Sequence, residues 1–139
     1  MIPSVVATSA YMRTICVLLG LSFCLSIHAA DYFGTMRMES GFELQNVRVE
    51  LDPSGRLTLF DVKFARLMPV RVDVVIPHVQ QRKQGAQTLL SGDRIVPMVN
   101  RKSHPDRIVK KLHGHADKQS LSFSCLLGGK ALRFEGKSK

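Results

Sequence analysis

The stretch SLSFSCLLGGKALRF, residues 120–134, decides the fold. Apolar and small polar residues alternate through its first half, and this period of two is typical of a strand with one buried face. The residues expected to face inward are Leu121, Phe123, Cys125 and Leu127. Gly128-Gly129 then predicts a two-residue hairpin turn, and Leu132 and Phe134 continue the inward phase of the returning strand.

The same pattern recurs upstream, with two interruptions. The apolar phase slips by one residue near Asn46 and again near Phe60-Asp61, and each slip predicts a β-bulge. Bulges in neighbouring strands indicate a strongly curved sheet. Residues 70–76 alternate cleanly, with Val70, Val72, Val74 and Ile76 in one phase.

Two short segments predict the ends of strands. Pro77 lacks a backbone N–H, so it predicts a strand end or a bulge, and His78 directly after it is expected at the rim. The segment QRKQG, residues 81–85, predicts a polar turn.

No window after residue 30 keeps a helical apolar period. About eight short strands, spaced by roughly ten residues, predict an all-β domain. At this length we expect a single small up-and-down antiparallel β-barrel, because closure removes exposed strand edges. An N-terminal signal segment precedes this barrel.

The N-terminus has the order of a secretory signal. Arg13 precedes the apolar residues 14–27, and small residues follow before Asp31. We predict cleavage after Ala29 or Ala30, which gives a signal peptide at 1–30 and a barrel domain at 31–139. The apolar run is shorter than the ~20 residues of a spanning helix, so the mature chain has no predicted transmembrane span. A buried core helix is the alternative interpretation.

Two details of this segment stay open. Met12 lies directly before the charge, so it is a better initiator than Met1. Cys24 raises the possibility of a lipid anchor, although Phe23 fits a lipidation motif weakly. The predicted location is the periplasm, the cell surface or the extracellular space. Cys125 is then the single cysteine of the mature chain, which therefore has no internal disulfide.

The mature chain is basic. Nineteen of the 20 Lys and Arg residues and all 11 acidic residues follow the signal, so its formal charge is 19 − 11 = +8. An anionic partner, such as lipid head groups or an acidic glycan, would use this charge, and a solvated basic surface is the alternative. Nucleic acid is not an expected partner, because the mature chain has no tryptophan and few aromatic residues near its basic stretch.

Four ordered segments resemble a known family. They are YFGTM (32–36), LDPSGRLTLFDVKF (51–64), MPVRVDVVIPHV (68–79) and KLHGHADKQSLSFSCLLGGKALRFEGK (111–137). They are similar to the opening strand, a hairpin, a central strand and the closing hairpins of the calycin-like β-barrel proteins secreted by Gram-negative bacteria. The resemblance implies a small lipocalin-like barrel and carries over no catalytic residue. This chain is more basic than the family between Arg101 and Lys118.

Few residues suggest catalysis, and we expect no enzyme and no cofactor. His113 and His115 would share one face of a strand and could reach one metal, but no third ligand is identifiable. Two surface histidines are the alternative. Lys110 and Lys111 are adjacent, so a regular strand would turn one of them inward. A bulge, an edge strand with an inward charge, or a partly polar barrel interior would each resolve this conflict.

Two functions are therefore predicted. The first is an exported, monomeric, non-enzymatic barrel that binds a small apolar or amphiphilic ligand in its lumen. The candidate lumen-lining residues are Val72, Val74, Ile76, Leu121, Phe123, Leu132 and Phe134. The alternative is an envelope or extracellular interaction protein with a filled barrel and a basic outer face.

Overall fold

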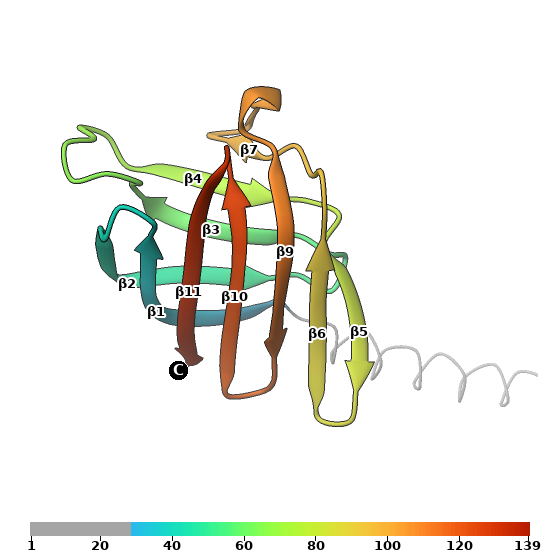
Figure 1. Cartoon of the computed structure of the whole chain (residues 1–139). Coiled ribbons are helices and arrows are strands. Elements are labelled where there is room, and N and C mark those ends of the chain that lie inside the picture. Colours follow the sequence, from blue (N-terminus) through green and yellow to red (C-terminus); the bar gives the residue numbers. More distant parts are fainter. Residues whose placement is uncertain (1–28) are drawn as a thin grey trace, which may run out of the picture.

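The computed structural model describes residues 29–139 and is all-β (Figure 1). The predicted signal segment, the Met12 start and Cys24 lie outside this range. The strands are β1 (Ala30–Met38), β2 (Glu43–Leu51), β3 (Leu57–Val62), β4 (Val72–Ile76), β5 (Gln80–Gln84), β6 (Gln87–Gly92), β7 (Met98–Val99), β8 (Lys102–Ser103), β9 (Val109–Ala116), β10 (Ser120–Leu127) and β11 (Lys130–Ser138). A 3-10 helix, η1 (Pro105–Arg107), lies between β8 and β9.

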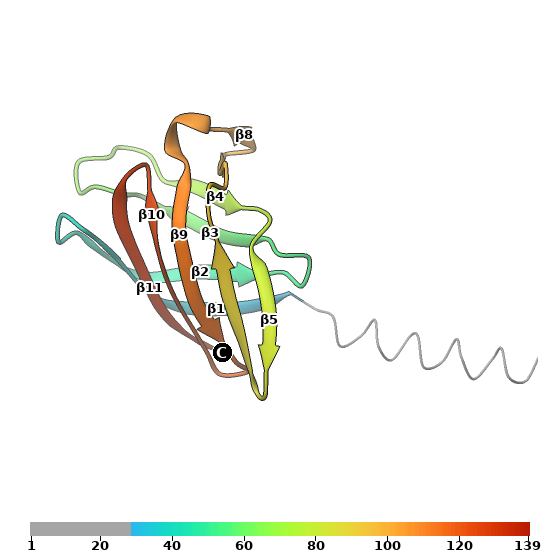
Figure 2. The same cartoon turned by 45° about the vertical axis from the view of Figure 1, so that its right-hand side comes forward.

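The strands form one curled antiparallel sheet of 11 strands, in the order β5-β6-β9-β10-β11-β1-β2-β3-β4-β7-β8. The all-β antiparallel prediction is confirmed, whereas the predicted count of about eight strands is wrong. Two views show a half-barrel in which β1 to β4 run across β9 to β11 (Figures 1 and 2). The two layers are continuous where β11 pairs with β1.

The order departs from a simple up-and-down meander after β4. That strand pairs with β7 rather than with β5, and β5-β6 joins β9 instead. The link between β4 and β5 explains the departure, because Pro77 has no N–H and His78 is exposed with a φ of 60°. The β2–β3 turn packs against this link, and the Val79 N–H donates to the carbonyl of Gly55 at 2.8 Å. Pro77 and His78 thus mark a corner of the half-barrel, as their predicted place at a strand end requires.

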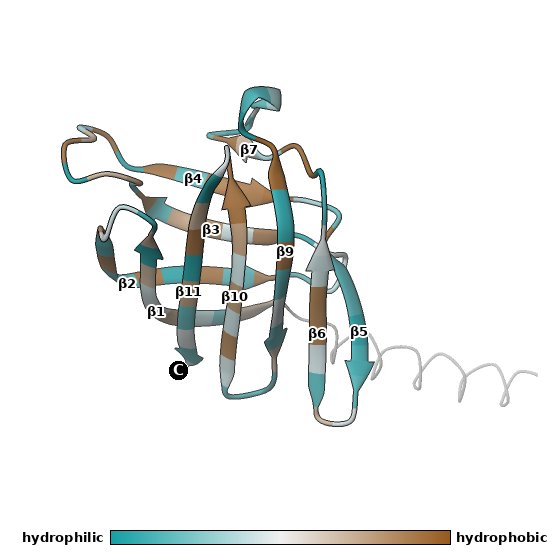
Figure 3. Ribbon diagram, viewed as in Figure 1, coloured by the Kyte–Doolittle hydropathy of each residue, from teal (hydrophilic) through white to brown (hydrophobic). Residues whose placement is uncertain are grey.

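Two edge features differ from the sequence predictions. Residues 81–85 were expected as a polar turn, but residues 80–84 form the edge strand β5, which is hydrophilic along its length (Figure 3). Because β5 has no buried face, alternation does not reveal it, and its charges protect the edge from pairing with other chains. Val70 was expected to face inward, but it is 60% exposed and precedes β4.

The two predicted bulges are confirmed, and a third resolves the conflict between adjacent lysines. Asn46, Asp61 and Lys111 have φ values of 57°, 53° and 52°, and each lies at a register shift between paired strands. At Lys111 the extra residue lets both Lys110 and Lys111 face solvent. The interpretation that one of these lysines makes the interior polar is therefore wrong.

The core lies between the two layers of the half-barrel. The rings of Phe123 and Phe134 lie near its centre, with centroids 5.6 Å apart, and both side chains are buried. The hairpin between them turns at Gly128 and Gly129, whose φ values of 59° and 83° match the predicted two-residue turn.

Asp117 holds the turn between β9 and β10. Its carboxylate accepts the backbone N–H of Gln119 at 2.7 Å and that of Ser120 at 2.8 Å, and these bonds lower the pKa of Asp117. The hydroxyl of Tyr32 donates to the backbone carbonyl of Asp117 at 2.8 Å. Burial, followed by the nearby Asp117 charge, raises the pKa of Tyr32. This turn is thereby fastened to β1.

The bulge at Asn46 can be tested by substitution. Asn46→Gly should change the free energy of unfolding little, since glycine adopts a positive φ without steric cost. Asn46→Val should lower it by about 1–2 kcal/mol, because a β-branched residue is strained in the left-handed region. Urea denaturation of both variants measures the difference. Equal stability of the two variants would contradict the bulge.

The Asp117 turn predicts a pH dependence. A carboxylate whose pKa is lowered on folding stabilises the fold above its unfolded pKa and loses this effect as the pH falls through the folded pKa. Asp117→Ala should therefore lower the melting temperature at neutral pH. The difference in melting temperature between the variant and the native chain should become smaller below about pH 4. Calorimetry across this pH range measures the difference in melting temperature. A difference that does not change with pH would contradict the stabilising role of the Asp117 carboxylate.

Candidate functional site

The candidate lumen residues all lie in the core between the layers. Each is at most 9% exposed, and all belong to one contiguous apolar cluster; they are Val72, Val74, Ile76, Leu121, Phe123, Leu132 and Phe134. The structure therefore brings together the residues that the alternation selected. A ligand among them stays a prediction.

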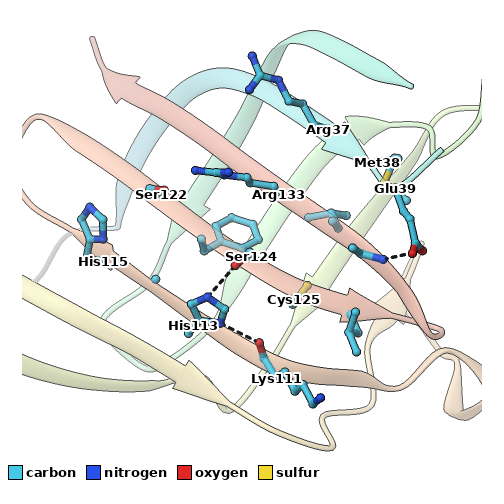
Figure 4. Close-up of a pocket in the computed structure, with 15 residues that line it drawn as sticks. Arg37, Met38, Glu39, Lys111, His113, His115, Ser122, Ser124, Cys125 and Arg133 are labelled. Atoms are coloured by element: carbon cyan, nitrogen blue, oxygen red, sulfur yellow. Dashed lines mark hydrogen bonds between the residues drawn. The ribbon is translucent and has the colours of Figure 1, made fainter. Parts of the chain in front are cut away.

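A hollow lies on the opposite, outer face of the sheet. It has a volume of about 700 Å³ and lies over β9, β10, β11 and the end of β1 (Figure 4). The outward residues of β10 at this place are Ser122, Ser124 and Leu126, and longer side chains flank the two serines on both neighbouring strands. Because serine is short, the outer surface dips along β10. We refer to this hollow as the serine trough.

Cross-strand pairing fixes one wall of the serine trough. Arg37 on β1 lies directly opposite Arg133 on β11, which in turn lies opposite Ser124. Like charges placed opposite one another repel. Carboxylates offset this repulsion, since Arg37 pairs with Glu43 and Arg133 pairs with Glu135, each at 2.9 Å.

The other wall follows β9, whose charged residues are all basic. Lys111, His113 and His115 line the trough, and Lys110 precedes them. The Lys111 bulge is fixed from the side, because the carboxylate of Asp93 accepts its backbone N–H at 3.1 Å. The β9 wall is thus the more cationic side of the trough.

Gly114 allows β9 to lie close to β10 in this wall. A Cβ at this position would meet the Cβ of Phe123 at 2.6 Å and would also collide with the backbone carbonyl of Ser122. The glycine between the two outward histidines therefore reflects packing over Phe123.

His113 is held in one orientation by two hydrogen bonds (Figure 4). Its Nδ1 lies 3.1 Å from the carbonyl of Lys111, which can only accept, so Nδ1 carries the proton in the neutral ring. The Ser124 hydroxyl then donates to Nε2 at 3.0 Å. A serine next to an oriented imidazole is also the geometry of an activated nucleophile.

The backbone around Ser124 offers few free donors to a reacting oxygen. An oxyanion site needs N–H groups that point at the reacting oxygen. β10 is paired on both sides, with β9 and β11, so the backbone N–H groups along it are largely used in the two ladders. The arrangement can offer hydroxyl, imidazole and cationic groups to a polar, acidic ligand.

Among residues 29–139, the structure supplies no third ligand for a metal at His113 and His115. Both lie on the outer face, opposite Ser124 and Ser122. Within residues 29–139, no group of three or more His, Cys, Asp or Glu side chains could hold a metal ion.

Sequence reasoning missed most of the serine trough. It selected inward residues, whereas Arg37, Ser122, Ser124 and Arg133 lie on the outward phase of the same strands. The signal available in the sequence was the run of outward serines in residues 120–124, which predicts a low surface wherever neighbouring strands carry long side chains.

Comparisons with known proteins identify no relative: no family model, no curated protein and no solved structure matches this chain. The calycin-like resemblance therefore stays a prediction. No helix within residues 29–139 has the length and apolar character to cross a membrane.

Cys125 provides a test of the core. Burial raises the pKa of its thiol to about 12, because the interior disfavours the thiolate. In a chain that starts at Ala29, the thiol should react with a disulfide reagent at pH 8 only after unfolding in urea. Rapid reaction of the folded chain would contradict the inward orientation of β10.

Proposed function

We propose that this chain is a non-enzymatic binding protein that takes an anionic, hydroxyl-rich ligand, such as an acidic glycan, in the serine trough. The observation that carries the proposal is the asymmetry of the trough. Its β9 wall combines Lys111 with two imidazoles, and its floor presents the hydroxyls of Ser122 and Ser124. An acidic group of the ligand would pair with the β9 wall, and its hydroxyls would bond to the floor.

The charge of the chain supports an acidic ligand. Residues 29–139 contain 19 basic and 11 acidic residues. Part of the basic charge is already paired, since Arg37 and Arg133 bind carboxylates. Lys111 makes no such ion pair in the described part of the chain, so its ammonium is available to the trough.

Placing the ligand on the outer face, rather than in the lumen, follows from burial. Phe123 and Phe134 are at most 2% exposed and pack on one another in the core. An interior that is filled by its own side chains leaves no room for a ligand. The proposal includes export, which agrees with an extracellular or envelope glycan as the acidic ligand.

The proposal predicts a local contribution from Lys111. Lys111→Asn removes the charge and keeps a residue that tolerates a positive φ. It should weaken binding of a sulfated tetrasaccharide about three- to fivefold, as expected for one partly solvated ion pair. Titration followed by NMR should shift the amide signals of Ser122 and Ser124, and affinity should fall as salt rises.

The matched control is Lys83→Gln, which removes an exposed positive charge from β5. It should leave the affinity unchanged, and maltotetraose, a neutral tetrasaccharide, should cause no shifts. An equal loss in both lysine variants would reduce the effect to net charge and overturn the site. Shifts of the amide signals of Val74, Ile76 and Leu121 would instead indicate that the ligand binds in the lumen.

A further inference from the structure

The nine-residue connection KFARLMPVR, residues 63–71, joins β3 to β4 and presents apolar side chains to solvent. Leu67 is 92% exposed and Val70 is 60% exposed. Among residues 29–139, Val96 is the one other large apolar side chain with high exposure, at 37%. Exposed apolar side chains on an ordinary protein surface are usually isolated from one another, whereas two of them lie together in this loop.

Internal contacts hold this loop in shape. Phe64 and Met68 are partly buried and pack against the core, and the Met68 N–H donates to the carbonyl of Ala65 at 3.1 Å. This bond closes a turn with Arg66 and Leu67 at its two corners. Leu67 therefore points outward, because Phe64 before it and Met68 after it are held against the core.

The loop also carries positive charge and no acidic residue. Its cations are Lys63, Arg66 and Arg71. Arg71 is directed back toward β3, where it donates to the carbonyl of Asp61 at 3.3 Å. The Lys63 ammonium lies 6.0 Å from the centre of the Phe42 ring. Arg66 lies at the exposed corner beside Leu67.

We infer that residues 63–71 dock the protein on an anionic lipid surface, with Leu67 and Val70 inserted among the head groups and Arg66 paired with lipid phosphate. Apolar tips flanked by cations gain from both the hydrophobic and the electrostatic part of the interface. The loop projects from the body in both views, and it carries both brown, hydrophobic and teal, hydrophilic segments (Figures 1, 2 and 3).

This inference stands independently of the serine trough, because the residues that line the trough belong to β1, β9, β10 and β11 or, for Glu39, directly follow β1. A ligand could occupy the trough while the loop contacts lipid, and either could fail without the other.

The absence of tryptophan from the sequence allows a direct test. Leu67→Trp places a single fluorescent reporter at the loop corner, and Ala86→Trp places one in the exposed β5–β6 turn as the control. The chain starts at Ala29, because every described strand lies after this point and because the apolar residues 14–27 would bind lipid themselves. The probe is a vesicle of equal parts phosphatidylcholine and phosphatidylglycerol.

The Leu67→Trp variant should show a blue-shifted emission on these vesicles, and the Ala86→Trp variant should show none. In vesicle sedimentation without the reporter, Leu67→Asn should weaken binding about tenfold, through lost apolar burial. Arg66→Gln should weaken it about fivefold, through one lost lipid contact. Unchanged melting temperatures would establish that both variants are folded.

Three results would overturn the inference. They are an unshifted emission of the Leu67→Trp variant on anionic vesicles, equal binding to pure phosphatidylcholine vesicles, and equal sedimentation of the native chain and Leu67→Asn. An emission shift caused by soluble heparin, but not by vesicles, would assign the loop to a glycan or protein partner instead.

Discussion

The turn at Gly128-Gly129 is the constraint on which most of the sheet depends. Both residues have positive φ, which fixes a tight hairpin and therefore the register of β10 against β11. β10 also pairs with β9, and β11 pairs with β1. The register of this hairpin therefore influences strand pairing in both layers of the half-barrel. A slip of one residue would bring the serines of β10 into the core and turn Phe123 outward.

The bulges shift the strand register at defined places, and the apolar side chains therefore stay on the inner face around the curve. At Asn46, Asp61 and Lys111 the chain takes one residue in the left-handed region, and the paired strand shifts by a step. Each bulge bends its strand and restores the inward phase of the apolar residues that follow. The curvature that joins the two layers therefore comes from the same residues that interrupt the alternation.

The same register creates the serine trough. Once Phe123 and Leu121 face inward, Ser122 and Ser124 must face outward, opposite His115 and His113. The trough exists because side chains of unequal length are paired across strands. Its charge is asymmetric because Arg37 and Arg133 form ion pairs with carboxylates, whereas the Lys111 ammonium forms none among residues 29–139. Core packing and surface chemistry are thus two consequences of one alternation.

The sequence by itself determined the all-β class, the hairpin at Gly128-Gly129, the bulges at Asn46 and Asp61, and the inward residues of β4, β10 and β11. These features depend on neighbours along the chain, through the period of two and the conformational freedom of single residues. Only the tertiary structure decided the strand order after Pro77, the edge strand β5, and the exposure of Val70 and Leu67. It alone also paired Arg37 with Arg133 and Ser124 with His113. Arg37 and Arg133 are far apart in the sequence, and no local pattern specifies which strands become neighbours when a sheet curls. Ser124 and His113 are only 11 residues apart, but the register between their strands shifts at the Lys111 bulge, which alternation alone does not place.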